Sequence, residues 1–246
     1  MSPVLVAVAH GSRDPAAKAC VLSLTSRVAG LAGEGIRVEA AFVQHEKPLL
    51  ETALAGATAE AGADGAVVVP LLLSSGYHLS YDIGAAARAA GVPVAPPLGP
   101  DPRLVSALAG RLDEAGVPGG VPVVLAAAGS RDQRALTDTR HQAAMLAAHR
   151  GAPVVAGFAS AARPTVDEAV TFLADLTGRP VAVAAYLLAP GLFHDQLWLS
   201  PGSWVSAPPG QKWFRCTSRT RSSIRARIRI PARWNIARHC GGHLVC

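Results

Sequence analysis

The sequence predicts an α/β fold in which parallel strands are joined by helices, and two observations support this prediction. Short apolar runs rich in valine alternate with alanine-rich stretches of helical spacing, which is the pattern of βαβ units in a parallel sheet. The whole pattern then occurs a second time, after about 116 to 118 residues, a period far longer than that of a solenoid repeat. We therefore expect two similar α/β lobes that face each other across a cleft.

The first half of the chain is expected to form four strands and four helices. The first strand stops at His10, and a Gly-Ser turn separates it from an alanine-rich helix that ends on glycines. Pro48 is expected to open the second helix, Asp82 to help cap the third, and Pro102 to begin the fourth. The expected strands are 4–9, 38–43, 66–73 and 92–95, and the expected helices are 15–33, 48–62, 83–90 and 102–112.

The second half repeats these elements after a glycine-rich joint at 116–120. Residues 121–132 repeat the first strand and its Gly-Ser-Arg-Asp turn, and 181–194 repeat the third strand and a loop that ends at His194. The repeat lacks one group, because Ala128 stands at the position of His10. We therefore predict a first lobe at 1–116 that carries the chemistry, a duplicated second lobe at 117–210, and an atypical tail at 211–246.

The positive charge of the chain is concentrated in this tail. All 17 acidic residues lie at or before Asp195, whereas 211–246 hold Lys212, eight arginines and three of the four cysteines. Such an abrupt change is expected from an out-of-frame reading of a GC-rich gene, so we interpret the C-terminus as frameshifted from a point between residues 197 and 211. A basic nucleic-acid arm has no recognisable motif here, and we expect no nucleic-acid partner. A metal site in the tail would use His239, Cys240, His243 and Cys246 as ligands, but their spacing matches no recognisable metal-binding motif.

The apolar segments do not predict a membrane protein. No uninterrupted apolar run reaches the roughly 18 residues that a spanning helix needs. No basic segment or cleavable signal precedes the first predicted strand. We therefore expect a cytoplasmic protein without membrane contact, and a monomer or homodimer, since one chain already holds both lobes.

Two histidines follow different predicted strands, each among glycine and serine residues. His10 follows the strand at 4–9, and His78 follows the strand at 66–73. The carboxyl ends of parallel strands meet at one edge of a sheet, where ligands bind. Neutral imidazole binds borderline divalent metals and also takes up protons near neutral pH. The pair therefore predicts a metal site with open positions, although either histidine alone could be an ordinary polar loop residue.

Other polar residues are expected at the same edge. His45 or Glu46 could supply a third ligand or a proton acceptor, or both could belong to a solvated loop. Hydroxyls, backbone amides and the Arg13 guanidinium could hold an anionic ligand, although Arg13 could equally pair with Asp14. The candidate ligand-binding residues are Ser12, Arg13, Ser74, Ser75, Gly76 and Tyr77, the last equally suited to packing.

Two motifs resemble a known family. His-Gly-Ser-Arg-Asp-Pro at 10–15 and Pro-Leu-Leu-Leu-Ser-Ser-Gly-Tyr-His at 70–78 closely resemble the sirohydrochlorin chelatases of the CbiX type, and the similarity covers roughly residues 3–200. The resemblance implies a class II chelatase fold of two flavodoxin-like lobes with the active site between them. It also implies insertion of Co²⁺ or Fe²⁺ into sirohydrochlorin, for cobalamin or siroheme synthesis.

The resemblance further assigns roles to residues. It implies that His10 and His78 are the metal-binding and proton-accepting pair. The family pattern Leu-Glu-Phe-x-Glu-Pro is altered here, because Gln44 and Lys47 stand at its acidic positions, which leaves Glu46 as the candidate acidic helper. The divalent metal is then a substrate, and no organic cofactor is expected because the sequence has neither a dinucleotide nor a phosphate-loop motif. A non-catalytic carrier of metal or tetrapyrrole would use the same pocket and remains the alternative.

Overall fold

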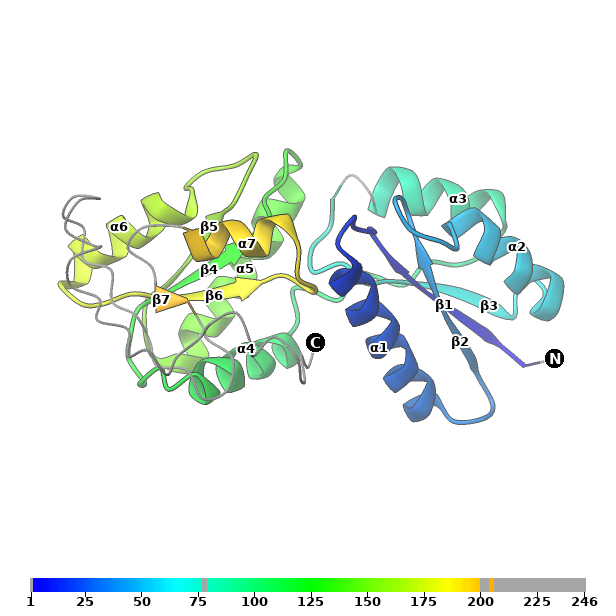
Figure 1. The fold of residues 1–246 in the computed structure, drawn as a ribbon, viewed down its shortest axis with the longest axis horizontal. Helices are drawn as coiled ribbons and strands as arrows, with labels where there is room; N and C mark the ends of the chain where they lie inside the picture. The colour runs from blue at the N-terminus through cyan, green and yellow to red at the C-terminus, as the bar shows by residue number, and fades with distance from the viewer. Residues whose placement is uncertain (1, 77–78, 200–203, 206–246) are drawn as a thin grey trace.

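The protein forms two parallel sheets that lie side by side, each flanked by helices (Figure 1). The computed structural model describes residues 2–76, 79–199 and 204–205. The first sheet has the order β2-β1-β3, and the second has the order β5-β4-β6-β7, with all the pairs parallel. The strands are β1 (Val4–Ala9), β2 (Arg37–Phe42), β3 (Ala66–Pro70), β4 (Val123–Ala127), β5 (Val154–Phe158), β6 (Ala182–Tyr186) and β7 (Trp204–Val205). The predicted α/β architecture with two lobes is confirmed.

In the first lobe, β1 is buried on both faces because two helices cover opposite sides of it. Val4, Val6 and Val8 pack toward α2 (Leu50–Ala61), whereas Ala7 and Ala9 pack toward α1 (Pro15–Ala32). The chain leaves β1 toward β2 on one side and reaches β3 on the other. The carboxyl end of β1 is therefore the topological switch point of this sheet, which is the place where open α/β sheets bind ligands.

The second lobe repeats this arrangement around β4, whose five residues are all buried. Its helices are α5 (Gln133–Arg150), α6 (Val166–Thr177) and α7 (Leu192–Leu199). Val123 and Leu125 face a core beside α5, and Val124 and Ala126 face a core beside α6. Among the described helices, none is both long enough and apolar enough to span a membrane.

Helix α4 (Pro102–Glu114) joins the two lobes in an unexpected way. It follows the first sheet in the chain, but its buried residues Val105, Ala109 and Leu112 lie in the core of the second lobe. It packs along α5, below the second sheet in Figure 1. The boundary at residue 116 describes the sequence repeat and stays a prediction. By its packing, α4 belongs with the second sheet.

The repeated Gly-Ser-Arg-Asp motif builds the same turn in both lobes. Ser12 Oγ accepts a hydrogen bond from Asp14 N at 3.1 Å, and Asp14 caps α1 by accepting from Ala16 N at 2.9 Å. In the second lobe, Ser130 Oγ accepts from Asp132 N at 3.0 Å, and Asp132 caps α5. In both lobes, the serine and the aspartate of this motif therefore shape the turn and cap the helix that follows.

Three local predictions were wrong. Helix α2 begins at Leu50 rather than at Pro48, because the Pro48 carbonyl accepts a hydrogen bond from Phe42 N and so belongs to the turn after β2. Asp82 does not cap α3 (Gly84–Ala89), since the chain is already helical in η1 (Leu79–Ile83). The strand expected at 92–95 is reduced to a single bridge between Val68 and Val94.

Candidate functional site

His10 directly follows β1 and lies against the loop that follows β2. Its Nε2 is 2.8 Å from Nε2 of Gln44, and Gln44 N donates to the His10 carbonyl at 3.1 Å. The Gln44 side-chain amide therefore lies in hydrogen-bond contact with the imidazole Nε2. A neutral imidazole at this position can bind a metal ion or take up a proton.

Gly11 allows these two loops to cross. It has a φ of +91°, and a Cβ at this position would lie 1.8 Å from the Gln44 carbonyl oxygen. Gly129 has a φ of +94°, and its Cβ would lie 1.9 Å from the Ser160 carbonyl oxygen. The second lobe therefore retains the backbone crossing but has Ala128 in place of the imidazole. Of the two crossings, the one in the first lobe carries an imidazole.

A pocket of about 140 Å³ opens beside His10 at the contact between the lobes. His10, Ser12 and Lys18 contribute its polar side chains. Its apolar walls come from the first lobe and from residues 188–190 of the second. The part of the candidate site that contains His10 therefore lies between the two lobes.

The second lobe also holds the loop that leads to His78. Tyr186, at the end of β6, donates from its hydroxyl to the Leu73 carbonyl at 2.8 Å. Asp138 on α5 accepts a hydrogen bond from Ser75 N at 2.7 Å. Burial and, to a smaller extent, the Asp138 and Asp101 carboxylates raise the pKa of Tyr186, so its hydroxyl stays a donor.

Sequence reasoning missed both of these contacts. Tyr186 is the only aromatic hydroxyl in the predicted strand at 181–188, and that placement is a signal that could have identified it. Nothing in the sequence distinguishes Asp138 from other helical carboxylates.

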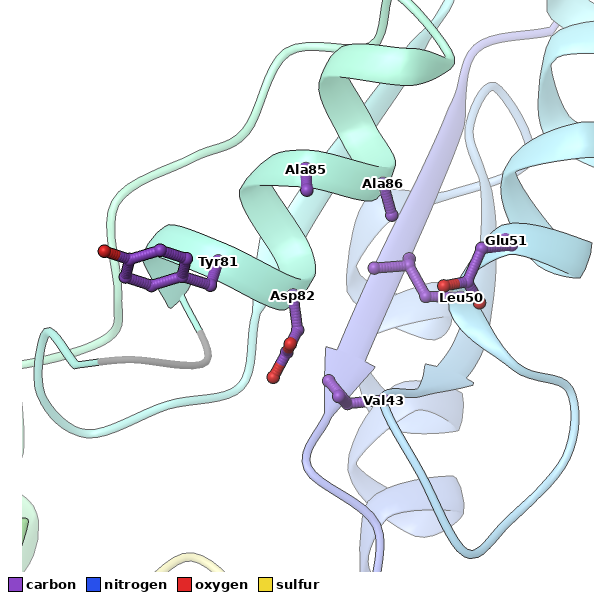
Figure 2. Close-up of a pocket in the computed structure, with 7 residues that line it drawn as sticks. All are labelled: Val43, Leu50, Glu51, Tyr81, Asp82, Ala85 and Ala86. Atoms are coloured by element: carbon purple, nitrogen blue, oxygen red, sulfur yellow. The ribbon is translucent and has the colours of Figure 1, made fainter.

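A second pocket, of about 330 Å³, lies wholly within the first lobe (Figure 2). It extends from Val43, which precedes Gln44, to Leu50 and Glu51 on one side and to Tyr81 and Asp82 on the other. Figure 2 shows the Tyr81 ring pointing away from Leu50 and Glu51. None of these residues was predicted as a site residue.

The other predicted site residues have different surroundings. Glu46 forms an ion pair with Lys18, with Oε2 2.7 Å from Nζ. Arg13 and His45 are exposed, whereas Ser74, Ser75 and Gly76 are half-buried near the second lobe. Tyr77 and His78 lie outside the described residues. Within the described ranges, no three His, Cys, Asp or Glu side chains form a ready-made metal site.

Comparisons with known proteins show which family and which folds this chain resembles. The model of the CbiX family matches residues 4–115 and 122–197. A sirohydrochlorin cobaltochelatase of Methanosarcina acetivorans is 34% identical over 79 residues, which make up 32% of this chain and 59% of that protein. The family match ends at residue 197, where the range of the predicted frameshift begins; the tail at 211–246 lies outside the described residues.

Two solved structures share the fold over most of the chain. SirB from Bacillus subtilis with Fe³⁺ has a TM-score of 0.71 at 26% identity, over 84% of this chain and 88% of that one. The sirohydrochlorin chelatase SirB from Bacillus subtilis subspecies spizizenii, in complex with cobalt, has a TM-score of 0.68 at 23% identity, over 84% and 87% of the two chains.

Proposed function

The chain belongs to the CbiX family, and from that premise we propose that it is a chelatase that inserts Co²⁺ or Fe²⁺ into sirohydrochlorin. One observation supports this most directly. The imidazole of His10, with Nε2 in contact with Gln44, lies at the switch point of the first sheet, beside a pocket that both lobes line. The relatives named as a cobaltochelatase and as SirB with iron or cobalt support the choice of metal and macrocycle.

The proposed reaction has two requirements, and imidazole meets both. Two pyrrole protons must leave the macrocycle, and a partly dehydrated cation must enter it. His10 binds the divalent ion through Nε2, where the Gln44 amide gives way, and accepts a proton when the ion has moved on. We assign the same two roles to His78, because the loop before it is held by Tyr186 and Asp138. Holding metal and ring together removes much of the entropic barrier.

The remaining predicted residues are proposed to bind the macrocycle. Sirohydrochlorin carries many carboxylates, and the exposed Arg13, which follows the pocket residue Ser12 in the chain, offers a guanidinium to them. The hydroxyls and amides of Ser12, Ser74, Ser75 and Gly76, with Tyr77, complete this set. We further propose that the protein works in the cytoplasm without an organic cofactor, as a monomer or homodimer.

Turnover with His10→Ala and His78→Ala variants tests the proposal. Metal insertion into sirohydrochlorin, followed by its absorption spectrum, should fall by at least about a hundredfold in each variant. His141→Ala on the exposed face of α5 is the matched control and should retain wild-type turnover. Retained turnover in the double histidine variant would refute the assignment. A carrier protein, the alternative function, would yield at most one equivalent of metallated product.

The same assay decides the role of Glu46. A carboxylate that accepts a pyrrole proton predicts that Glu46→Gln lowers kcat by about a hundredfold with little change in KM. The contact with Lys18 favours a positioning role, for which KM changes instead.

A further inference from the structure

Two positions of the internal repeat are charged in the first lobe and apolar in the second. Lys18 is the fourth residue of α1, and Leu136 is the fourth residue of α5. Glu46 and Ala162 each stand two residues before the proline of the turn after the second strand of their lobe. Leu136 is buried in the core of the second lobe, and the partly buried Ala162 packs against that core. At the same two positions, the first lobe has the Lys18–Glu46 ion pair.

The stability of the fold does not explain why the first lobe has charged residues where the second lobe has apolar ones. The side chains of Lys18 and Glu46 are 36% and 17% exposed, so the pair has lost much of its hydration. Partly exposed ion pairs contribute about 0–1 kcal/mol, and well-packed apolar residues are often as stable or more stable at such positions. A requirement other than folding therefore keeps the charge in the first lobe.

The surroundings of Lys18 suggest what that requirement is. Lys18 lines the same pocket as His10, and its Nζ lies 6.0 Å from the centroid of the Phe42 ring. An ammonium has three N–H donors, and Glu46 is the only side chain to which Lys18 donates within the described part of the chain. The other side chains that line the pocket, such as Val21 and Leu188, are mostly apolar.

The size of this pocket limits what it can hold. Whole-ligand pockets usually measure roughly 300–1,000 Å³, so the 140 Å³ beside His10 suits one short side chain of a larger molecule. An alkyl arm that ends in a carboxylate matches apolar walls with one cation. Sirohydrochlorin carries such arms on its rim.

We propose that Lys18 binds one rim carboxylate of the tetrapyrrole and that Glu46 positions the Lys18 ammonium for this contact. The inference rests on the proposed function and adds a substrate-binding residue to it. Anchoring one arm beside His10 fixes which edge of the macrocycle faces the imidazole. Glu46 accepts one N–H of Lys18, and an ammonium has two further N–H donors for a carboxylate in the pocket that Lys18 lines.

Replacing the pair with its second-lobe counterparts tests the proposal. The double variant Lys18→Leu, Glu46→Ala restores the apolar pair, and Lys18→Met and Lys18→Arg change the ammonium alone. Affinity for metal-free sirohydrochlorin is measured by fluorescence titration, KM and kcat by insertion, and Co²⁺ affinity by absorption of the metal alone. Arg27→Leu, exposed on the same helix, is the matched control.

We expect the affinity for sirohydrochlorin to fall and KM to rise by about 10- to 100-fold in Lys18→Met and in the double variant, as for loss of a charge-assisted hydrogen bond. Lys18→Arg should retain most of the wild-type affinity for sirohydrochlorin. In the Lys18 variants, kcat and the affinity for Co²⁺ should stay within about threefold of the wild-type values. An unchanged affinity in folded Lys18→Met would overturn the inference, and so would an equal loss in Arg27→Leu. Sirohydrochlorin binding that depends on Lys18 without any metal insertion would instead refute the proposed function alone.

Discussion

The hydroxyl of Tyr186 is expected to hold the loop that leads to His78, and Tyr186→Phe removes that hydroxyl alone. Its hydrogen bond to the Leu73 carbonyl is 2.8 Å long, and the tyrosine is only 5% exposed. The phenylalanine ring fits the same space, so no cavity forms. The cost is that of leaving a half-buried carbonyl without its donor, about 1–3 kcal/mol.

Two measurements on Tyr186→Phe check this reasoning. In a chain of this size, a loss of about 2 kcal/mol lowers Tm by roughly 4–8 °C, which calorimetry resolves. A loosened loop also misplaces His78, so kcat/KM for metal insertion should fall by about tenfold or more. Tyr81→Phe, whose ring is 61% exposed, is the control and should change stability by no more than about 0.5 kcal/mol. Wild-type stability and kcat/KM in Tyr186→Phe would refute the claim that this hydroxyl holds the loop.

Three further predictions follow from the same structure. Asp138→Ala removes the acceptor of Ser75 N and should lower kcat/KM with a loss of about 1–3 kcal/mol in urea unfolding; unchanged kcat/KM would contradict a role in holding the loop. Gly11→Ala should lose roughly 2–5 kcal/mol and turnover, while Gly129→Ala should lose similar stability but less turnover; equal losses of turnover would show that the two crossings contribute alike. Asp101→Asn should reduce acid sensitivity between about pH 4 and pH 2, measured by urea midpoints across that range; a wild-type acid profile would contradict it.

The sign of the last prediction follows from the α4 cap. A hydrogen bond from the Arg103 side chain, with a second from its backbone N–H, lowers the pKa of Asp101 to about 2. A carboxyl group whose pKa is lowered in the folded state stabilises the protein above the unfolded pKa, and this contribution is lost as the pH falls through the folded value. Asn at this position can still cap α4 but does not titrate.

The sequence was sufficient for the features that repeat. The periodic apolar runs predicted the two sheets, and the second Gly-Ser-Arg-Asp turn exposed the duplication because both copies obey the same turn chemistry. His10 could be placed at a sheet edge, since the end of a parallel strand fixes that position. Ala128 has no imidazole at the position of His10, and the interpretation that the first lobe carries the chemistry stays a prediction.

Contacts between distant segments could not be predicted. Glu46 was expected as a proton acceptor or a ligand, and nothing local to it indicates Lys18, 28 residues earlier, as its partner. Tyr186 and Leu73 are 113 residues apart, and their contact depends on how two lobes dock. Pro48 was misread because proline is also common in turns, and the hydrogen bond from Phe42 N to its carbonyl places it in one. Asp82 was misread because the chain is already helical in η1 before it reaches α3.

The position of α4 has a consequence for any attempt to divide the protein. A cut at residue 116 would follow the boundary of the sequence repeat. It would also remove Val105 and Leu112 from the core that they share with Leu146, and so expose apolar surface on the second lobe. The boundary of the sequence repeat and the boundary between the two packed lobes therefore lie at different residues. An exchange of one half between relatives would preserve these contacts only if α4 were moved together with the second lobe.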